Sequence, residues 1–263
     1  MALIDTVSDY DRLAHIYDRW VSGDPASEEC LRFYLDWGKS CEDTIVELGV
    51  GTGRIALALA KAGKRVVGVD CSSAMLQRCR QKAEQAQVGD RIRLVKADIR
   101  AFDLGLQSKL IIFPMRSIGH LLSQDDRRAM LHRVYQHLAP GGLFIFDHYV
   151  FDEAWARTHD GIPRLLYASP NPETEGVYIW DTYVYDFMLS RMRCHVTEER
   201  TDATGTVLLR RHYSFYFSWI YPKQMRQIAD ETGFEVMQVL GSFSGAPFND
   251  ESSDQIWLLR RRV

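Results

Sequence analysis

The sequence predicts an α/β fold in which a doubly wound, seven-stranded, mostly parallel sheet carries an inserted small antiparallel β-sheet. Two observations predict the main sheet. Short β-rich apolar runs alternate with helical patterns between about residues 44 and 150, and a glycine-rich turn joins the first run to the first helix. Strands and helices alternating at this spacing are typical of βαβ units around a buried parallel sheet. A change to extended, aromatic runs after Tyr149 predicts the insertion.

Composition limits the classes of partner that fit this chain. Its 263 residues are enough for one large domain or for a domain with a sizeable insertion. The net charge of -3 and the pI near 6.2 lack the basic excess of an extended phosphate-binding surface, so no nucleic-acid partner is expected. Five cysteines without a Cys-x-x-Cys pair argue against a disulfide framework and a zinc knuckle.

The cellular setting follows from the ends of the chain and from its hydropathy. Residues 1–5 carry an acid where a signal peptide needs basic residues. No apolar run approaches the ~20 residues of a membrane span. We therefore expect a cytoplasmic protein without a membrane partner.

Five apolar runs predict the parallel strands, at residues 44–47, 66–69, 92–95, 110–113 and 143–146. The first intervening helix has one apolar face and ends at Gly63, and Ser72 or Ser73 caps the next. Asp125 and Asp126 open a third helix at its positive end. Residues 139–142, Ala-Pro-Gly-Gly, predict a turn that leads into the fifth strand.

Residues from about 164 to 219 predict the inserted antiparallel sheet. They are extended and aromatic, and residues 202–205 form a hairpin-like turn between two runs. A helix from about Pro222 to Thr232 and two strands around residues 235–240 and 255–260 then complete the main sheet.

The turn after the first strand, residues 47–53, has the sequence Glu-Leu-Gly-Val-Gly-Thr-Gly. Glycines let the backbone approach a ligand closely, and the following helix presents free N–H groups to it. This context predicts a nucleotide-bearing cofactor. A reading from Gly51 to Ala56 leaves NAD open on glycine spacing alone. Glu47 instead favours a cationic ligand through charge pairing.

Two aspartates end the next predicted strands. Asp70 follows the glycine turn by about 17 residues and is placed to accept both hydroxyls of a ribose. Asp98 ends the third strand, where it can accept a hydrogen bond from an adenine amino group. Each alone also fits a helix cap or a surface acid. Together they favour binding of a nucleoside at the carboxyl edge of the sheet.

These motifs resemble those of class I S-adenosylmethionine-dependent methyltransferases, which have Rossmann-like folds. Residues 47–54 match the first motif of the family, Val69-Asp70 and Ala97-Asp98 match its two strand-end acids, and residues 138–142 match its turn before the fifth strand. Tyr10-Asp11, Tyr17-Asp18 and residues 233–236 resemble its small-molecule branch. The resemblance implies S-adenosylmethionine as cofactor. The cofactor-binding residues assigned on this basis are Glu47, Gly49, Gly51, Gly53, Asp70, Cys71, Asp98, Ile99, Pro114 and Tyr10.

The resemblance also implies the domain organisation of the chain. Residues 1–43 form an N-terminal helical lid, 44–150 the Rossmann-like S-adenosylmethionine-binding core, 151–220 the inserted sheet that covers the substrate, and 221–263 the completing helix and strands. Closure of the lid would bring Tyr10, Tyr17 or Trp20 towards the methyl group, where an aromatic face orients a sulfonium. Simple amphipathic packing of these residues is the alternative.

Two segments should border the transferred methyl group, residues 113–120 and 147–149. The candidate catalytic residues are His148 and His120 as bases, Tyr17 as an orienting group, and Arg116 as a partner for an acidic substrate or the cofactor carboxylate. An ion pair for Arg116 and a packed turn for His120 are the alternatives. Phe113-Pro114-Met115-Arg116-Ser117 departs from the Asn/Asp-Pro-Pro-Tyr signature of many nucleic-acid and protein amine methyltransferases. Asp147 and His148 lack further clustered ligands, so no metal is expected.

The function expected from this sequence is methyl transfer to N or O of a small, partly aromatic or apolar metabolite, in a setting such as specialised metabolism. The aromatic residues of the insertion either line the acceptor pocket, pack structurally, or pair two subunits as a homodimer. Two alternatives stay open. One is a cofactor-binding regulatory protein without turnover, and the other is an RNA or protein methyltransferase.

Overall fold

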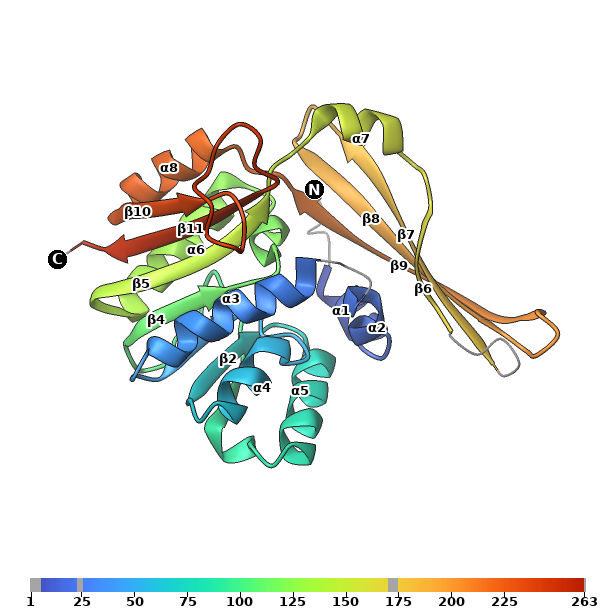
Figure 1. Cartoon of the computed structure of the whole chain (residues 1–263), viewed down its shortest axis with the longest axis horizontal. Helices are drawn as coiled ribbons and strands as arrows, with labels where there is room; N and C mark the ends of the chain where they lie inside the picture. Colours follow the sequence, from blue (N-terminus) through green and yellow to red (C-terminus); the bar gives the residue numbers. More distant parts are fainter. Residues whose placement is uncertain (1–5, 23–25, 170–174, 263) are drawn as a thin grey trace. The chain divides into compact units, whose positions relative to one another are not determined.

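The computed structural model describes residues 6–22, 26–169 and 175–262, and the chain divides into two compact units (Figure 1). The core unit consists of Glu28–Phe151 and Trp219–Val263. The sheet unit consists of Met1–Ser27 and Asp152–Ser218. Each unit contains its own β-sheet. No helix in the described part of the chain is long and apolar enough to cross a membrane.

The core unit is built on the predicted seven-stranded sheet, with strand order β10-β11-β5-β4-β1-β2-β3. Neighbouring pairs among β1 to β5 are parallel, and β11 runs antiparallel to both β5 and β10. The predicted α/β class and mostly parallel sheet are therefore confirmed. The strands are β1 (Ile45–Leu48), β2 (Val66–Asp70), β3 (Ile92–Lys96), β4 (Ser108–Phe113), β5 (Leu138–Tyr149), β10 (Phe234–Leu240) and β11 (Asp254–Arg261).

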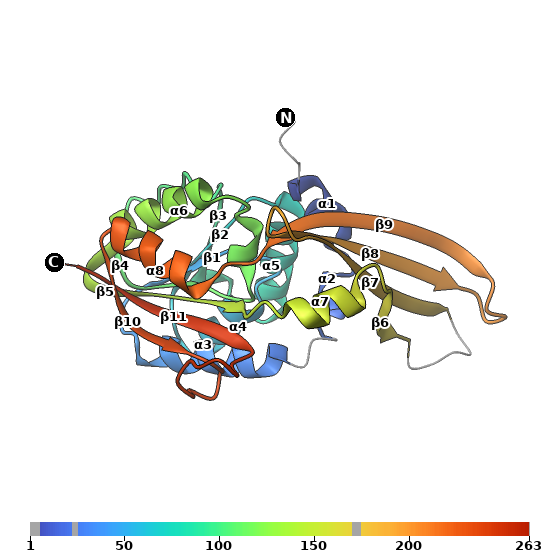
Figure 2. The ribbon, with the colours of Figure 1, turned by 90° about the horizontal axis from the view of Figure 1, so that it is seen from above.

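Helices cover both faces of this sheet (Figure 2). α6 (Gln124–His137) and α8 (Pro222–Glu231) pack on one face, and α3 (Ala26–Ser40) and α4 (Arg54–Lys61) pack on the other. The unit also contains α5 (Ser73–Gln85) and two 3-10 helices, η1 (Gly89–Arg91) and η2 (Ser117–His120). Because both faces are covered, all four residues of β1 are buried, including the ionisable Glu47.

Local sequence signals explain where several of these helices begin. Ser72 caps α5 and accepts a hydrogen bond from the Met75 N–H at 3.1 Å. Ser123 caps α6 in the same way, so Asp125 and Asp126 lie in its first turn. The prediction is less accurate at β5. The strand already begins at Leu138, and the Ala-Pro-Gly-Gly segment forms a register irregularity within it instead of a separate turn.

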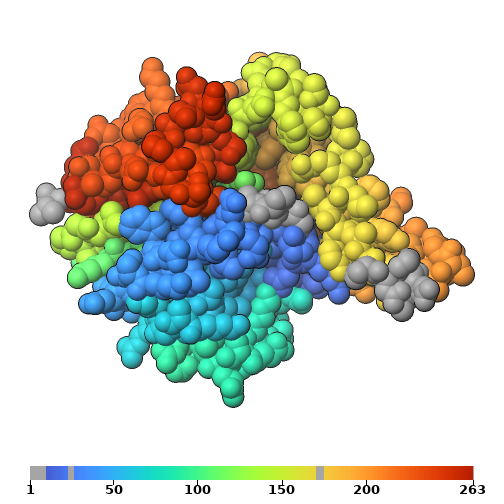
Figure 3. All heavy atoms as spheres, viewed as in Figure 1, coloured from blue at the N-terminus to red at the C-terminus, as the bar shows by residue number. Residues whose placement is uncertain are grey.

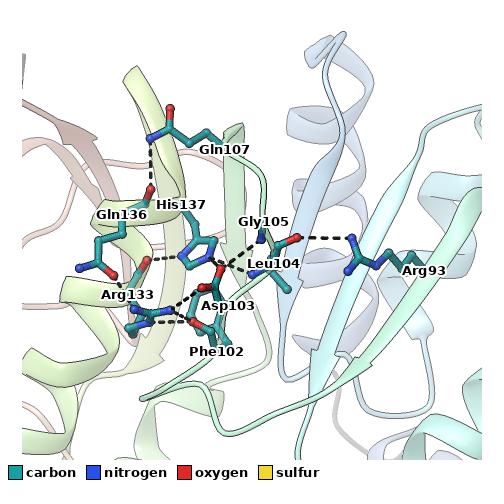
Figure 4. Close-up of polar contacts among 9 residues, drawn as sticks. All are labelled: Arg93, Phe102, Asp103, Leu104, Gly105, Gln107, Arg133, Gln136 and His137. Carbon is teal, nitrogen blue, oxygen red and sulfur yellow. Dashed lines mark hydrogen bonds and ion pairs between the residues drawn. The ribbon is translucent and has the colours of Figure 1, made fainter.

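The connection from β3 to β4 is anchored to the C-terminal end of α6 (Figure 4). His137 Nε2 accepts a hydrogen bond from the Leu104 N–H at 3.1 Å, and Nδ1 lies 2.8 Å from the Arg133 carbonyl oxygen. Arg133 Nε in turn donates to the Phe102 carbonyl oxygen at 2.6 Å. These bonds satisfy backbone groups of a connection that has no regular structure of its own.

The sheet unit contains the predicted antiparallel sheet, with strand order β6-β7-β8-β9. Its strands are β6 (Arg164–Ala168), β7 (Gly176–Asp186), β8 (Arg191–Thr201) and β9 (Val207–Ser218), and its helices are α1 (Thr6–Leu13), α2 (Tyr17–Ser22) and α7 (Glu153–His159). The turn between β8 and β9 is the predicted one. Asp202 accepts hydrogen bonds there from the Thr204 and Thr206 N–H groups at 2.9 Å each.

Aromatic side chains join α1 and α2 to this sheet. Tyr10 stacks on Phe215 with ring centroids 4.8 Å apart, and Trp20 lies 5.4 Å from the same ring. Tyr17 contacts both Tyr10 and Trp20 edge to face. Phe215 is fully buried. These aromatic residues therefore pack against the buried Phe215 within the sheet unit.

Candidate cofactor and active site

The glycine turn lies where the strand order of the core sheet reverses. β1 pairs with β2 on one side and with β4 on the other, so the connections leaving β1 and β4 diverge. In a doubly wound sheet this arrangement opens a crevice at the carboxyl ends of the strands, where ligands bind. Gly49, Gly51 and Gly53 follow β1 at that edge, and α4 begins directly after them.

We call the turn formed by Gly49 to Gly53 the glycine cradle. Its three glycines have left-handed backbone angles, with φ of 62° at Gly49, 52° at Gly51 and 87° at Gly53. A Cβ at position 49 would lie 3.2 Å from the Phe113 ring, and one at position 53 would lie 2.4 Å from Cys79 Sγ. Side chains are therefore disfavoured at all three positions by backbone conformation, and space adds a tight contact at position 49 and a clash at position 53. The result is bare backbone beside the N-terminus of α4, which suits the close approach of a ligand.

Glu47 is buried immediately before the cradle. Burial raises the pKa of its carboxyl well above the ordinary value, although a backbone hydrogen bond from Ala56 acts in the opposite direction. No hydrogen-bond partner for its Oε2 atom lies among the described residues. An orphaned buried oxygen costs free energy that a cationic group can recover. This feature fits the amino and sulfonium groups of S-adenosylmethionine.

Asp70 performs a second task that the sequence did not indicate. Its Oδ2 accepts a hydrogen bond from the Gly51 N–H and its Oδ1 accepts one from the Ser72 N–H, both at 2.8 Å. The carboxylate therefore ties the cradle to the start of α5. Each carboxylate oxygen can accept more than one hydrogen bond, so this arrangement is compatible with the ribose contact assigned to Asp70. Cys71 is exposed next to it.

Asp98 lies on the connection after β3, and its carboxylate is engaged with a neighbouring side chain. Arg100 Nε lies 3.0 Å from Oδ1 and 3.1 Å from Oδ2, and the same guanidinium reaches Asp126 at 2.6 Å. The hydrogen bond from Arg100 lowers the pKa of the Asp98 carboxyl despite partial burial. An adenine amino group would therefore meet an ion-paired carboxylate. Ile99 packs against the adjacent hydrophobic core.

The loop after β4 is held by a buried carboxylate. Asp147 accepts hydrogen bonds from the N–H groups of Met115, at 3.0 Å, and Arg116, at 2.8 Å. Tyr34 on α3 donates its hydroxyl to Asp147 Oδ1 at 2.6 Å. Burial raises the pKa of Asp147 to about 6, and the hydrogen bonds from Tyr34 and Arg116 oppose that rise. Sequence reasoning considered Asp147 only as a metal ligand and did not single out Tyr34.

Arg116 forms an ion pair, one of the two roles considered for it from the sequence. One terminal nitrogen of its guanidinium lies 3.2 Å from Oδ1 of Asp254, the first residue of β11. Pro114, two residues earlier, is buried, and its carbonyl oxygen accepts the Ser117 hydroxyl at 2.7 Å. A role for Arg116 with an acidic substrate therefore competes with the existing Asp254 partner.

His120 and His148 come from two elements that contact each other, η2 and β5. His148 is buried, and its ring lies 4.3 Å from that of Tyr149. Further along, Phe151 stacks on Trp219 with centroids 3.8 Å apart. Within the described ranges of the chain, no three His, Cys, Asp or Glu side chains gather where they could hold a metal ion.

Two predicted site residues, Tyr10 and Tyr17, belong to the sheet unit. Their contact with the cofactor stays a prediction. A separate groove of about 580 Å³ lies along the outer side of α3 and the connection between β10 and β11, which share this side of the core unit (Figure 3). Phe33, Trp37 and Phe243 line it, and no residue of the glycine cradle does.

Comparison with known proteins identifies the chemistry of the core. Residues 45–142 match a family described as a methyltransferase domain. The cypemycin N-terminal methyltransferase of Streptomyces sp. is 26% identical over 231 residues, which cover 83% of each chain.

Solved structures share the fold over almost the whole chain. The CcbJ methyltransferase from Streptomyces caelestis superposes with a TM-score of 0.81 at 23% identity, covering 98% of this chain and 100% of that one. CalS10, an amino pentose methyltransferase from Micromonospora echinaspora, superposes with a TM-score of 0.65 at 20% identity, covering 96% and 91%. These solved structures show the shared fold, and the match to a methyltransferase domain identifies the chain as an S-adenosylmethionine-dependent methyltransferase, with S-adenosylmethionine as its cofactor.

Proposed function

We propose that this methyltransferase methylates an amino nitrogen of a small, partly aromatic or apolar metabolite. The acceptors named for two similar proteins, a peptide N-terminus and an amino pentose, both offer an amino nitrogen. The net charge of -3 gives no support to an RNA acceptor. Specialised metabolism is the setting that fits such acceptors.

The observation that carries this proposal is the presence of two histidines on contacting elements next to the loop that follows β4. His120 ends η2 only three residues after Ser117, and His148 lies on the contacting strand β5. When bound, S-adenosylmethionine supplies an electrophilic sulfonium methyl group. An ammonium acceptor must lose a proton before its nitrogen can attack, and a neutral imidazole accepts protons near pH 7. Phe151 is partly exposed and stacks on the buried Trp219, so its ring is the apolar group proposed to contact the rest of the acceptor.

The cofactor roles form part of the same proposal. Glu47 faces the charged end of the cofactor, the three glycines line its methionine and ribose portions, and Asp70 holds the ribose. Asp98 and Ile99 hold the adenine, and Cys71, Pro114 and the lid residue Tyr10 complete the cofactor-binding set. Because Asp70 also holds the Gly51 N–H, replacing it by alanine would disturb the cradle itself. Gly51→Val alters the glycine turn directly, so it tests whether the cofactor binds at that turn.

A labelled-methyl assay tests the acceptor class. The purified protein is incubated with labelled S-adenosylmethionine and separate panels of amino sugars, short peptides with free N-termini, and phenols, and the products are located by mass spectrometry. We expect N-methylated products, at least tenfold less product with His148→Ala or with His120→Ala, and none with Gly51→Val. Only O-methylated products, or labelling of RNA or protein alone, would refute the amine proposal. Cofactor binding without any product would favour the regulatory alternative.

A homodimer through the sheet unit is proposed on separate grounds. Leu165 and Leu208 on its strands are 48% and 59% exposed, which is unfavourable for apolar side chains in water. Light scattering coupled to size-exclusion chromatography should give twice the mass of 30.3 kDa. A monomeric mass at micromolar concentration would remove this part of the proposal.

A further inference from the structure

The loop after β4 contains two consecutive residues in the left-handed backbone region. Met115 has a φ of 62° and Arg116 a φ of 57°. Residues with a Cβ rarely adopt this conformation, and they keep it only where surrounding contacts impose it. Such strain also concentrates at functional sites. The contacts that impose this conformation are therefore of interest for the reaction.

Asp147 provides those contacts. Its two oxygens accept the N–H groups of the two strained residues, one each, and Oδ1 also accepts the Tyr34 hydroxyl. Three donors thus converge on one side chain that is 1% exposed. An ionised carboxylate can satisfy all three, because it accepts hydrogen bonds without donating any. Charge-assisted hydrogen bonds of this kind are stronger than neutral ones.

The strained loop reaches the glycine cradle directly. A Cβ built on Gly49 would lie 3.2 Å from the Phe113 ring and 3.6 Å from both Cβ and Oγ of Ser117. Phe113 and Ser117 flank the loop on its two sides. A change in the backbone of the loop would therefore move the surface against which Gly49 packs, and with it the cradle.

We infer that Asp147 is a positioning residue for cofactor binding. Held by Tyr34, its ionised carboxylate keeps Met115 and Arg116 in the conformation that supports the glycine cradle. This inference rests on the placement of the cofactor proposed above. We assign Asp147 no contact with the transferred methyl group or with the acceptor nitrogen. Its carboxylate acts through the backbone of the loop after β4.

The ionisation state of Asp147 supplies a readout that simple packing would lack. The titratable and charged groups that interact with it are Cys30 and Tyr34 on α3, Arg116 after β4 and Asp254 on β11. Their combined effect, dominated by burial, gives Asp147 a pKa of about 6. The Tyr34 hydrogen bond lowers that pKa. Removing the Tyr34 hydroxyl should therefore raise it.

Calorimetric binding of S-adenosylhomocysteine between pH 5 and pH 8 tests the inference without any acceptor. At pH 5, one unit below a pKa of about 6, roughly one molecule in ten is ionised, so the dissociation constant should be about tenfold weaker than at pH 8. Tyr34→Phe should move the midpoint of this dependence to higher pH, while binding at pH 8 stays within about threefold of the wild type. Burial also raises the pKa of Glu47, but Tyr34 is not among the groups that shift it, so Glu47 does not account for a change caused by Tyr34→Phe.

The Asp147→Asn variant tests the same inference in a second way, by the same binding measurement. The amide keeps one acceptor oxygen but turns a donor towards the loop, so one of the two N–H groups loses its partner. Binding at pH 8 should weaken at least tenfold, and its dependence on pH should flatten. Circular dichroism establishes that each variant is folded. If Asp147→Asn does not fold, the midpoint of the Tyr34→Phe variant still decides the matter.

Gly51→Val separates the two proposals. If it abolishes binding while the Tyr34→Phe midpoint equals that of the wild type, the cofactor site stands and the role of Asp147 is overturned. If Gly51→Val binds S-adenosylhomocysteine normally, the cradle is misplaced and both proposals are overturned. A raised midpoint in Tyr34→Phe together with loss of binding in Gly51→Val supports both.

Discussion

Replacing Gly53 by alanine should destabilise the core unit through two separable effects. The backbone at this position has a φ of 87°, and the left-handed conformation costs an alanine about 1–2 kcal/mol. The new Cβ would also lie 2.4 Å from Sγ of Cys79, a buried side chain on α5. Overpacking of this kind costs roughly 1–3 kcal/mol. The expected loss of unfolding free energy is therefore about 2–5 kcal/mol.

The two effects can be separated with a matched glycine and a relieved background. Gly63 has a nearly identical φ of 86°, but nothing lies within 4 Å of its added Cβ. Gly63→Ala should therefore cost only the backbone part, about 1–2 kcal/mol. Cys79→Ala removes the sulfur, so Gly53→Ala should cost the same smaller amount in that background. The coupling energy between positions 53 and 79 is then about 1–3 kcal/mol.

Scanning calorimetry of these variants provides the assay. If two transitions appear, the one that S-adenosylhomocysteine moves to higher temperature belongs to the core unit. The reasoning would be refuted if Gly53→Ala destabilised this transition no more than Gly63→Ala. It would also be refuted if Cys79→Ala left the cost of Gly53→Ala unchanged.

Three further predictions concern ionisable side chains. The pKa of Asp147 rises from 3.8 to about 6 on folding, so the folded state binds more protons than the unfolded state between pH 3.8 and pH 6. As pH rises through this range, the free energy of unfolding of the wild type should fall by about 3 kcal/mol relative to that of Asp147→Asn. Urea unfolding at pH 3.5 and pH 7 would show no such difference if burial did not raise the pKa of Asp147. His137→Ala should cost about 1–3 kcal/mol by leaving the Leu104 N–H without its acceptor, measured by urea unfolding, and an unchanged midpoint would contradict this. Asp98→Ala should keep the free energy of unfolding within about 1 kcal/mol of the wild-type value, because the ion pair between Asp98 and Arg100 is partly exposed. The same variant should bind S-adenosylhomocysteine about tenfold more weakly than the wild type. An affinity equal to that of the wild type, measured by calorimetry, would argue against the adenine contact.

Much of the fold follows from local patterns in the chain. Apolar runs alternating with amphipathic segments specify β-strands and α-helices from short-range periodicity, and the glycine spacing marks a backbone that no other residue tolerates. Capping also acts over a few residues, which is why Ser72 was identified correctly. The sequence did not predict the irregularity in β5, because Ala-Pro-Gly-Gly is typical of a turn. Pairing with β4 decides where β5 begins.

The chain by itself thus determined the seven-stranded sheet, the inserted antiparallel sheet and the glycine-rich turn after β1, where we propose that the cofactor binds. Only the tertiary structure decided how that cradle is supported. Tyr34 and Asp147 are separated by 113 positions, and Asp147 meets Met115 across 32. Contacts of this range leave no periodic or spacing signal in a sequence, since they exist only once helix α3, strand β5 and the β4 loop have packed together. For the same physical reason, the sequence indicated a ribose contact for Asp70 but not the hydrogen bond that Asp70 accepts from the Gly51 N–H.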